Sequence, residues 1–383
     1  MSPIVSAGKY CPPARFAEFV YNAAISLTRR PMLARIASLL CCLLFAPVHA
    51  AEISGAGSSA AMPLYLRLAA AYAVPGATTL AYQGSGSAAG LRQIRERRVD
   101  FGASDVAPGA AELASAKLVS FPSAISGVVP VFNVPGLRSG ELLLTGELLA
   151  DIFGRKITRW NDARLAAVNP RASLPALPIV VLVRSDGSGT TYNFTDYLSE
   201  ASSDWQQVFG RNLAIAWPAD TVAVKGSAGV VAALRQTVGA IAYVDYNYVQ
   251  QEKLAYAKLR NRDGRFVAPS ADGFAVALDH SGWKTEGRYE EMLTNKAGGA
   301  SWPITMGTFV IVPRMAGRPE TMIATLKFFT WGFLYGEQIV GAANFVRLPD
   351  RVQARVYAEF TKITDSRGQP LRWTLAEVMA SHP

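Results

Sequence analysis

The chain has 383 residues, of which 50% are hydrophobic and 17% are charged. This balance is typical of a globular protein, because disordered chains have fewer apolar residues and more net charge. Lys and Arg exceed Asp and Glu by nine, but only residues 92–98 form a basic cluster. We interpret that cluster as the solvated face of a helix and expect no nucleic-acid partner.

Residues 29–50 have the layout of a secretory signal peptide. Three arginines precede an apolar run at 36–45. Val48 and Ala50 then provide the small residues at positions −3 and −1 that signal peptidase accepts, so cleavage is expected after Ala50. The run is too short to span a bilayer. We therefore expect residues 1–50 to be a removed leader and the remaining chain to be periplasmic. Two questions stay open: whether translation starts at Met32, and whether the signal is of the twin-arginine kind.

The residue types after position 50 argue against several kinds of chemistry. All three cysteines lie before it, which excludes a disulfide scaffold, a catalytic thiol and a cysteine-ligated metal. Only His280 and His382 follow it, and the sequence has no HExxH motif, EF-hand loop or G-x-S-x-G nucleophile elbow. We therefore expect no catalytic residues, no metal site and no cofactor.

Short β-rich runs alternate with helical stretches along the rest of the chain. Ile179 to Val183 is an unbroken run of the kind that is buried on both faces of a parallel sheet. The alternation favours an α/β fold. In chain order we predict strands at 52–54, 79–82, 99–101, 179–183 and 308–312. We predict helices at 62–73, 320–335 and 350–361, and two further helices that end at 98 and at about 198.

Two segments are candidates for crossings between domains. Residues 122–135 hold a β-type run bracketed by prolines, and the Gly-rich stretch at 298–305 leads into a predicted strand. Two crossings would make one domain discontinuous, because it would be built from both ends of the chain.

Three strand-to-helix turns share one chemistry, at 57–59, 84–87 and 186–190. Each offers glycines for close backbone approach, hydroxyl donors, and free N–H groups at the start of a helix, which together suit an oxyanion. In βα units such turns lie at the carboxyl edge of the sheet, where ligands bind. Helix capping explains each turn taken alone. The three together, with Arg184 beside the third, indicate an anion site, and the missing G-K-[ST] ending disfavours nucleoside triphosphates.

The segments that contain these turns resemble the periplasmic phosphate-binding proteins of Pst-type ABC transporters. The resemblance extends in one order over essentially the whole chain after residue 50. It is carried by GAGSSAAMPLY (55–65), YQGSGSAAGLRQI (82–94), VDFGASD (99–105) and RSDGSGTTYNFTDYL (184–198), and by segments 133–142, 239–248, 302–305 and 365–371.

The resemblance implies a two-lobed venus-flytrap fold of the α/β class, in which each lobe is a sheet flanked by helices. Two crossing hinge segments would join the lobes. We expect lobe I to comprise residues 51–127 and 306–383, and lobe II to comprise residues 128–305.

The resemblance also implies that phosphate lies in the cleft between the lobes. At such a site, Asp105 would accept a hydrogen bond from a protonated phosphate oxygen, and Asp186 would orient Arg184. The family usually has Phe at the position of Ala60 and often Ser-Gly-Gly at 88–90, where this chain has Ala-Ala-Gly. The implied phosphate-binding residues are Ser59, Ala60, Ser87, Asp105, Arg184, Asp186, Ser188, Gly189 and Thr190.

The function that follows is capture of inorganic phosphate by a monomer and its delivery to the membrane permease subunits of an ABC importer. Such a protein would not be an enzyme. Two alternatives stay open: a protein of the same fold that binds another oxyanion or senses phosphate, and a secreted phosphatase with a Ser or Asp nucleophile. The scarcity of histidines and metal ligands counts against the phosphatase.

Overall fold

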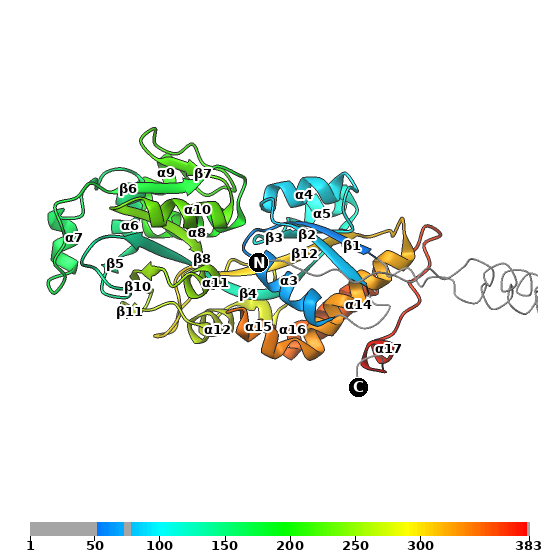
Figure 1. Cartoon of the computed structure of the whole chain (residues 1–383). Coiled ribbons are helices and arrows are strands. Elements are labelled where there is room, and N and C mark those ends of the chain that lie inside the picture. Colours follow the sequence, from blue (N-terminus) through cyan, green and yellow to red (C-terminus); the bar gives the residue numbers. More distant parts are fainter. Residues whose placement is uncertain (1–51, 73–77, 381–383) are drawn as a thin grey trace, which may run out of the picture. The chain divides into compact units, whose positions relative to one another are not determined.

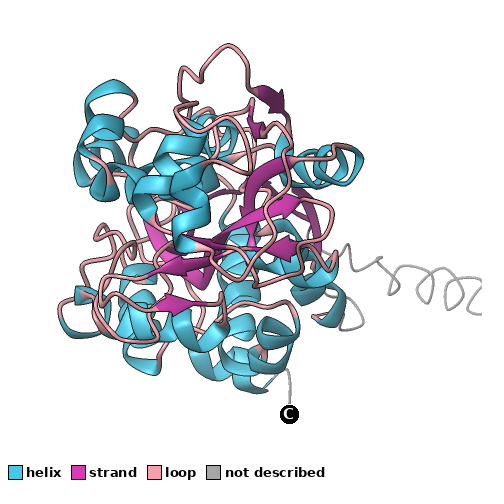
Figure 2. Ribbon diagram, turned by 90° about the vertical axis from the view of Figure 1, so that its left-hand side faces the viewer, coloured by secondary structure: helices cyan, strands magenta, loops and turns pink. Residues whose placement is uncertain are grey.

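The computed structural model describes residues 52–72 and 78–380, in which helices surround a mixed sheet (Figure 1 and Figure 2). The predicted signal peptide and its cleavage site lie outside these residues. Within the described ranges, no helix combines the length and the apolar character needed to cross a membrane.

The main sheet has the strand order β2-β1-β3-β12-β4-β8-β6-β7, with β9 paired to β4. The first three strands of this order are parallel to one another, and β6 is parallel to both β7 and β8, as its buried sequence predicts. These strands are β1 (Glu52–Gly57), β2 (Thr79–Gln83), β3 (Phe101–Ser104), β4 (Leu118–Asn133), β6 (Val180–Arg184), β7 (Val222–Val224), β8 (Ala240–Asp245), β9 (Ala255–Tyr256) and β12 (Thr305–Pro313).

A smaller sheet and the helices complete the described part of the chain. The smaller sheet has the order β11-β10-β5, with β5 (Leu143–Leu144), β10 (Lys258–Arg260) and β11 (Phe266–Val267). The helices are α3 (Met62–Ala71), α4 (Ser87–Arg95), α5 (Ala110–Ala116), α6 (Gly146–Phe153), α7 (Ala163–Val168), α8 (Gly189–Ala201), α9 (Ser203–Val208), α10 (Gly226–Gln236), α11 (Tyr246–Gln251), α12 (Ala271–Asp279), α13 (Gly282–Thr285), α14 (Pro319–Tyr335), α15 (Glu337–Ala342), α16 (Asp350–Phe360) and α17 (Leu375–Ala380).

The long strand β4 lies in the middle of the main sheet and joins its two ends. Its residues 118–127 pair with β12, and its residues 128–133 pair with β8. Figure 1 shows the green elements from β5 to α11 at one end of β4 and the blue and orange elements at the other. The first predicted crossing segment lies on β4 except for its last two residues, and the second leads into β12, of which it contains only Thr305. The predicted lobe boundary at 127–128 coincides with the change of partner, and the boundaries themselves stay a prediction.

Two clusters of aromatic side chains anchor the two ends of the sheet. Tyr65, Phe101 and Phe329 meet edge to face, with ring centroids 5.1 to 5.9 Å apart. At the other end, Phe194 of α8 stacks on Tyr243 of β8 with centroids 4.2 Å apart. Each ring is fully buried or nearly so, and such burial contributes about 1.5–3 kcal/mol for a Phe. The second cluster fixes the start of α8 against the sheet.

Several predicted boundaries were wrong; strand β1, for example, extends to Gly57 rather than ending at 54. The third strand occupies 101–104 rather than 99–101, because its small residues fit under α4: a Cβ on Gly102 would lie 2.9 Å from the Ile94 side chain. Helix α4 ends at Arg95 rather than 98, and Arg97 has a left-handed φ of 57°. Strand β12 begins at 305, three residues before the prediction.

Of the two prolines that bracket the first crossing segment, Pro122 lies inside β4, whereas Pro135 lies just beyond its end. Pro122 is opposite Phe309, where the register of β4 against β12 shifts. A bulge of this kind accommodates a residue that has no N–H to donate.

Candidate anion-binding site

The structure brings the three predicted turns into direct contact. We call residues 57–61 the first loop, 84–88 the second loop and 185–190 the third loop. The Ser87 hydroxyl accepts hydrogen bonds from the N–H of Gly189 (3.1 Å) and of Asp105 (3.3 Å). The N–H of Ala88 donates to the carbonyl of Gly187 at 3.0 Å. The second and third loops, about 100 residues apart in sequence, therefore share one hydrogen-bond network.

Glycine is required where the second and third loops touch. Gly86 has a φ of 93°, and a Cβ there would lie 2.5 Å from a carboxylate oxygen of Asp186. A Cβ on Gly189 would lie 2.6 Å from the Ser87 hydroxyl and 2.9 Å from the Asp105 nitrogen. Neither position can hold a larger residue without separating the loops.

The first loop follows β1 and places its two serines differently. The Ser58 hydroxyl donates to the Asp105 carboxylate, with both oxygens at 2.7 Å. The Ser59 hydroxyl lies 2.9 Å from the hydroxyl of Ser227. Ser59 therefore reaches an element of the opposite end of the sheet, whereas Ser58 stays on its own side. The N–H of Ala60 donates to no group in the described part of the chain.

Asp105 directly follows the last residue of β3 and is buried, with 2% of its surface exposed. It accepts hydrogen bonds from Ser58 and, at 2.9 Å, from the hydroxyl of Thr308 on β12. Burial raises the pKa of Asp105 to about 6, although these two hydrogen bonds and the charge of Arg184 act in the opposite direction. This carboxyl group can therefore exchange a proton near neutral pH.

The buried Arg184 and the partly buried Asp186 form a bidentate ion pair at the start of the third loop. The Arg184 Nε donates to Asp186 Oδ1 at 2.7 Å, and Nη2 donates to Oδ2. Burial alone would raise the pKa of the Asp186 carboxyl. The hydrogen bonds and the charge of Arg184, together with a hydrogen bond from the Gly226 N–H, outweigh burial and hold this pKa below its usual value. The remaining Arg184 nitrogen, Nη1, lies 3.3 Å from the Ser227 hydroxyl. The ion pair thus directs the Nη1 edge of the guanidinium toward Ser227 and the first loop.

The rest of the third loop begins helix α8. The Ser188 hydroxyl caps this helix by accepting the N–H of Thr191 at 3.2 Å. The Thr191 hydroxyl lies 2.7 Å from the hydroxyl of Tyr243, which also accepts the N–H of Arg184. Thr190 is buried, and its N–H has no acceptor within residues 52–72 and 78–380. Of the nine sequence-predicted residues, seven lie in these loops, and the other two, Asp105 and Arg184, lie directly beside them at the ends of β3 and β6.

Sequence reasoning missed three residues whose side chains bond directly to the side chains of predicted residues. Ser227 is 1% exposed and lies between Ser59 and Arg184. Its signal was present, because Gly226-Ser227 follows β7 and opens α10, which is the same pattern as the three turns. Ser58 belongs to the first predicted turn, whose pattern assigns it no separate role. Thr308 lies in the interior of a strand, and no local pattern distinguishes it.

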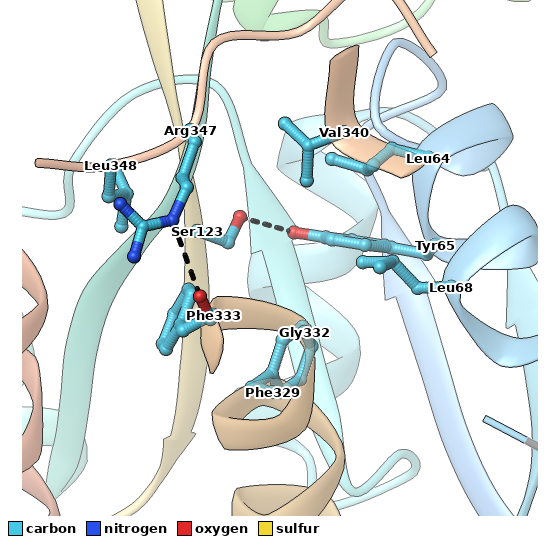
Figure 3. A pocket seen from close by; sticks show the side chains of 10 residues that line it. All are labelled: Leu64, Tyr65, Leu68, Ser123, Phe329, Gly332, Phe333, Val340, Arg347 and Leu348. Carbon is cyan, nitrogen blue, oxygen red and sulfur yellow. Dashed lines mark hydrogen bonds between the residues drawn. The ribbon is translucent and has the colours of Figure 1, made fainter. Parts of the chain in front are cut away.

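A pocket elsewhere in the structure has the wrong chemistry for an anion (Figure 3). Its polar groups are already paired: Tyr65 and Ser123 bond to each other at 2.8 Å, and Arg347 donates to the carbonyl of Phe333. It is lined by Leu64, Tyr65, Leu68, Ser123, Phe329, Gly332, Phe333, Val340, Arg347 and Leu348. Across the described residues, no three His, Cys, Asp or Glu side chains gather in a way that could hold a metal ion.

Comparison with known proteins agrees with the predicted resemblance. Residues 46–331 match the model of a family described as "PBP superfamily domain". The phosphate-binding protein PstS of Pasteurella multocida is 39% identical over 324 residues, which cover 84% of this chain and 94% of the relative. PstS of Haemophilus influenzae is 40% identical over 312 residues, covering 82% and 93%.

Solved structures show the same fold. A high-affinity periplasmic phosphate-binding protein bound with phosphate, PfluDING, aligns with a TM-score of 0.63 at 22% identity, covering 86% of this chain and 98% of that one. A putative phosphate ABC transporter substrate-binding protein from Clostridium perfringens aligns with a TM-score of 0.58 at 18% identity, covering 78% and 100%. The predicted two-lobed α/β fold is confirmed. The chain belongs to the PstS family of phosphate-binding proteins, within the PBP superfamily.

Proposed function

We propose that this protein binds inorganic phosphate between its two lobes and delivers it to the permease subunits of a phosphate ABC importer. The observation that carries the proposal is the buried Asp105 carboxyl group beside hydroxyls, helix N-termini and Arg184. A carboxylate repels a fully ionised anion but accepts a hydrogen bond from a protonated one. Phosphate keeps a proton near neutral pH, so it satisfies both the donors and the carboxylate.

The proposed ligands are the nine sequence-predicted residues together with Ser227. The N–H groups of Ala60 and Thr190, which have no acceptor among the described residues, and the Ser59 hydroxyl would donate to phosphate oxygens. Nη1 of Arg184 would exchange its contact with Ser227 for a phosphate oxygen. Because Asp186 neutralises Arg184, much of the remaining stabilisation would come from the N-terminal ends of α4, α8 and α10.

We further propose that the protein acts as a monomer in the periplasm, with lobe I at 51–127 and 306–383 and lobe II at 128–305. We also propose that it is a carrier rather than an enzyme, since its relatives are named as binding proteins. An assay of phosphate release from p-nitrophenyl phosphate tests the absence of enzymatic activity. Turnover by the purified protein would favour the phosphatase alternative.

Calorimetry on protein first stripped of bound ligand tests phosphate binding. Titration with phosphate should give saturable heat at one site, and titration with sulfate under the same conditions should give none. Absence of phosphate binding would refute the proposal. Equal binding of both anions would favour the alternative of a protein for another oxyanion.

A further inference from the structure

Helix α11 begins directly where strand β8 ends, close to the strand that joins the two ends of the sheet. Asp245 is the last residue of β8 and lies opposite Val128, where β4 changes its pairing partner. The Asp245 carboxylate caps the helix by accepting the N–H of Asn247 at 2.9 Å. The second and third residues of α11, Asn247 and Tyr248, are thereby held in fixed positions against β4 and β8 (Figure 1).

These two residues bond to the backbone of the first loop, almost 190 residues away in sequence. Asn247 Nδ2 donates to the carbonyl of Ala60 at 3.0 Å, and the Tyr248 hydroxyl donates to the carbonyl of Ser59 at 3.1 Å. Asn247 Nδ2 also donates to Asp245 Oδ1. Both neighbours of Nδ2 are acceptors, so the amide has only one favourable orientation. Asn247 is fully buried and Tyr248 is 7% exposed.

The geometry of the peptide unit connects these bonds to the anion site. In a trans peptide the C=O and the following N–H point in opposite directions. A bond that holds the Ser59 carbonyl toward Tyr248 therefore directs the Ala60 N–H away from α11. That N–H has no acceptor in the part of the chain that the structure describes. Burial raises the pKa of Tyr248 to about 12, so its hydroxyl keeps its proton at physiological pH.

We propose that Asn247 and Tyr248 are positioning residues, which hold the first loop by its carbonyls so that its N–H and Ser59 hydroxyl face the phosphate. The inference rests on the proposed function and adds a role for α11. Because α11 and the first loop extend from opposite ends of the sheet, the same two bonds hold these ends together while the ligand is bound. Losing them should therefore speed ligand release.

The test compares Tyr248→Phe with Tyr246→Phe in the purified full protein. Tyr248→Phe removes only the hydroxyl, and we expect phosphate to bind about three- to tenfold more weakly, the usual effect of one neutral hydrogen bond. The loss should appear in the dissociation rate measured by stopped flow. Tyr246 lies in the same helix, and its hydroxyl bonds to no residue among those described, so its variant should match the wild type.

A double-variant cycle separates positioning from general stabilisation. If Tyr248 acts through the first loop, Tyr248→Phe should cost less affinity in a Ser59→Ala background than in the wild type. Equal losses in both backgrounds, or a lower melting temperature with unchanged phosphate affinity, would overturn the proposal. Should Tyr248→Phe not fold, Asn247→Ala tests the Ala60 bond by the same measurements. A wild-type protein that binds no phosphate would instead refute the proposed function.

Discussion

Replacing Asp105 by Asn should reduce the preference for phosphate over sulfate. Sulfate carries no proton at neutral pH, so the ionised Asp105 would face it as an unpaired acceptor beside a negative charge. A site built around a ligand hydroxyl typically rejects an analogue that lacks it by about 10⁴-fold or more. Asn keeps the size of the side chain, removes the charge and can present an N–H donor.

The structure sets the size of the expected change. Asp105 is buried, and two unit charges about 4 Å apart interact with about 4 kcal/mol at the effective dielectric constant of protein sites. Removing this repulsion should improve sulfate binding by up to about a thousandfold. Phosphate should lose affinity, because the hydrogen bond from its proton to a charged acceptor is worth about 1.5–3 kcal/mol. The preference for phosphate over sulfate should therefore narrow chiefly because the variant binds sulfate more tightly.

The assay is calorimetric titration of both anions between pH 5 and pH 8. Because the pKa of Asp105 is raised to about 6, the wild type should begin to bind sulfate below that pH, where the protonated carboxyl can donate. The Asp105→Asn variant should bind sulfate without this dependence on pH. Asp100→Asn is the matched control, since Asp100 lies near β3 but bonds to Ser54 and Arg318. If Asp105→Asn left sulfate binding undetectable and phosphate binding unchanged, the role of Asp105 would be wrong, and Asp186 would be tested next.

Three further perturbations test other parts of the site. Arg184→Ala should weaken phosphate binding in calorimetry by about 1.5–3 kcal/mol, and unchanged affinity would exclude a charged contact. Asp245→Asn should stabilise the ligand-free protein at pH 8 but not at pH 4 in urea unfolding. Burial raises the pKa of Asp245 to about 7, so its stabilising contribution is present at low pH and lost as the pH rises through about 7; equal stability of variant and wild type at pH 8 would contradict this. Small-angle scattering should show a smaller radius of gyration with phosphate than without, and no change on saturation would count against hinge closure on β4 and β12.

Much of the architecture could be predicted because its signals are local. The β-branched run at 179–183 and the alternation of β-rich and helical stretches mark their elements through neighbouring residues alone. The Gly and Ser turns do the same, since a strand that enters a helix needs a tight turn and a cap within a few residues. These turns, with Arg184, are enough by themselves to indicate an anion site.

What only the tertiary structure decided depends on residues that are far apart in sequence. Three of the four residues of strand β3, Gly102 to Ser104, are small and have little strand preference of their own, and β3 forms because β1 and β12 pair with it. The pKa of Asp105 reflects burial and a bond from Thr308, 203 residues later. Ser227 joins the site because folding places it 2.9 Å from the Ser59 hydroxyl. Burial and long-range contacts arise only when the chain packs. The sequence therefore determined which kinds of groups are available to bind an anion. Packing determined which of these groups meet and which of them are charged.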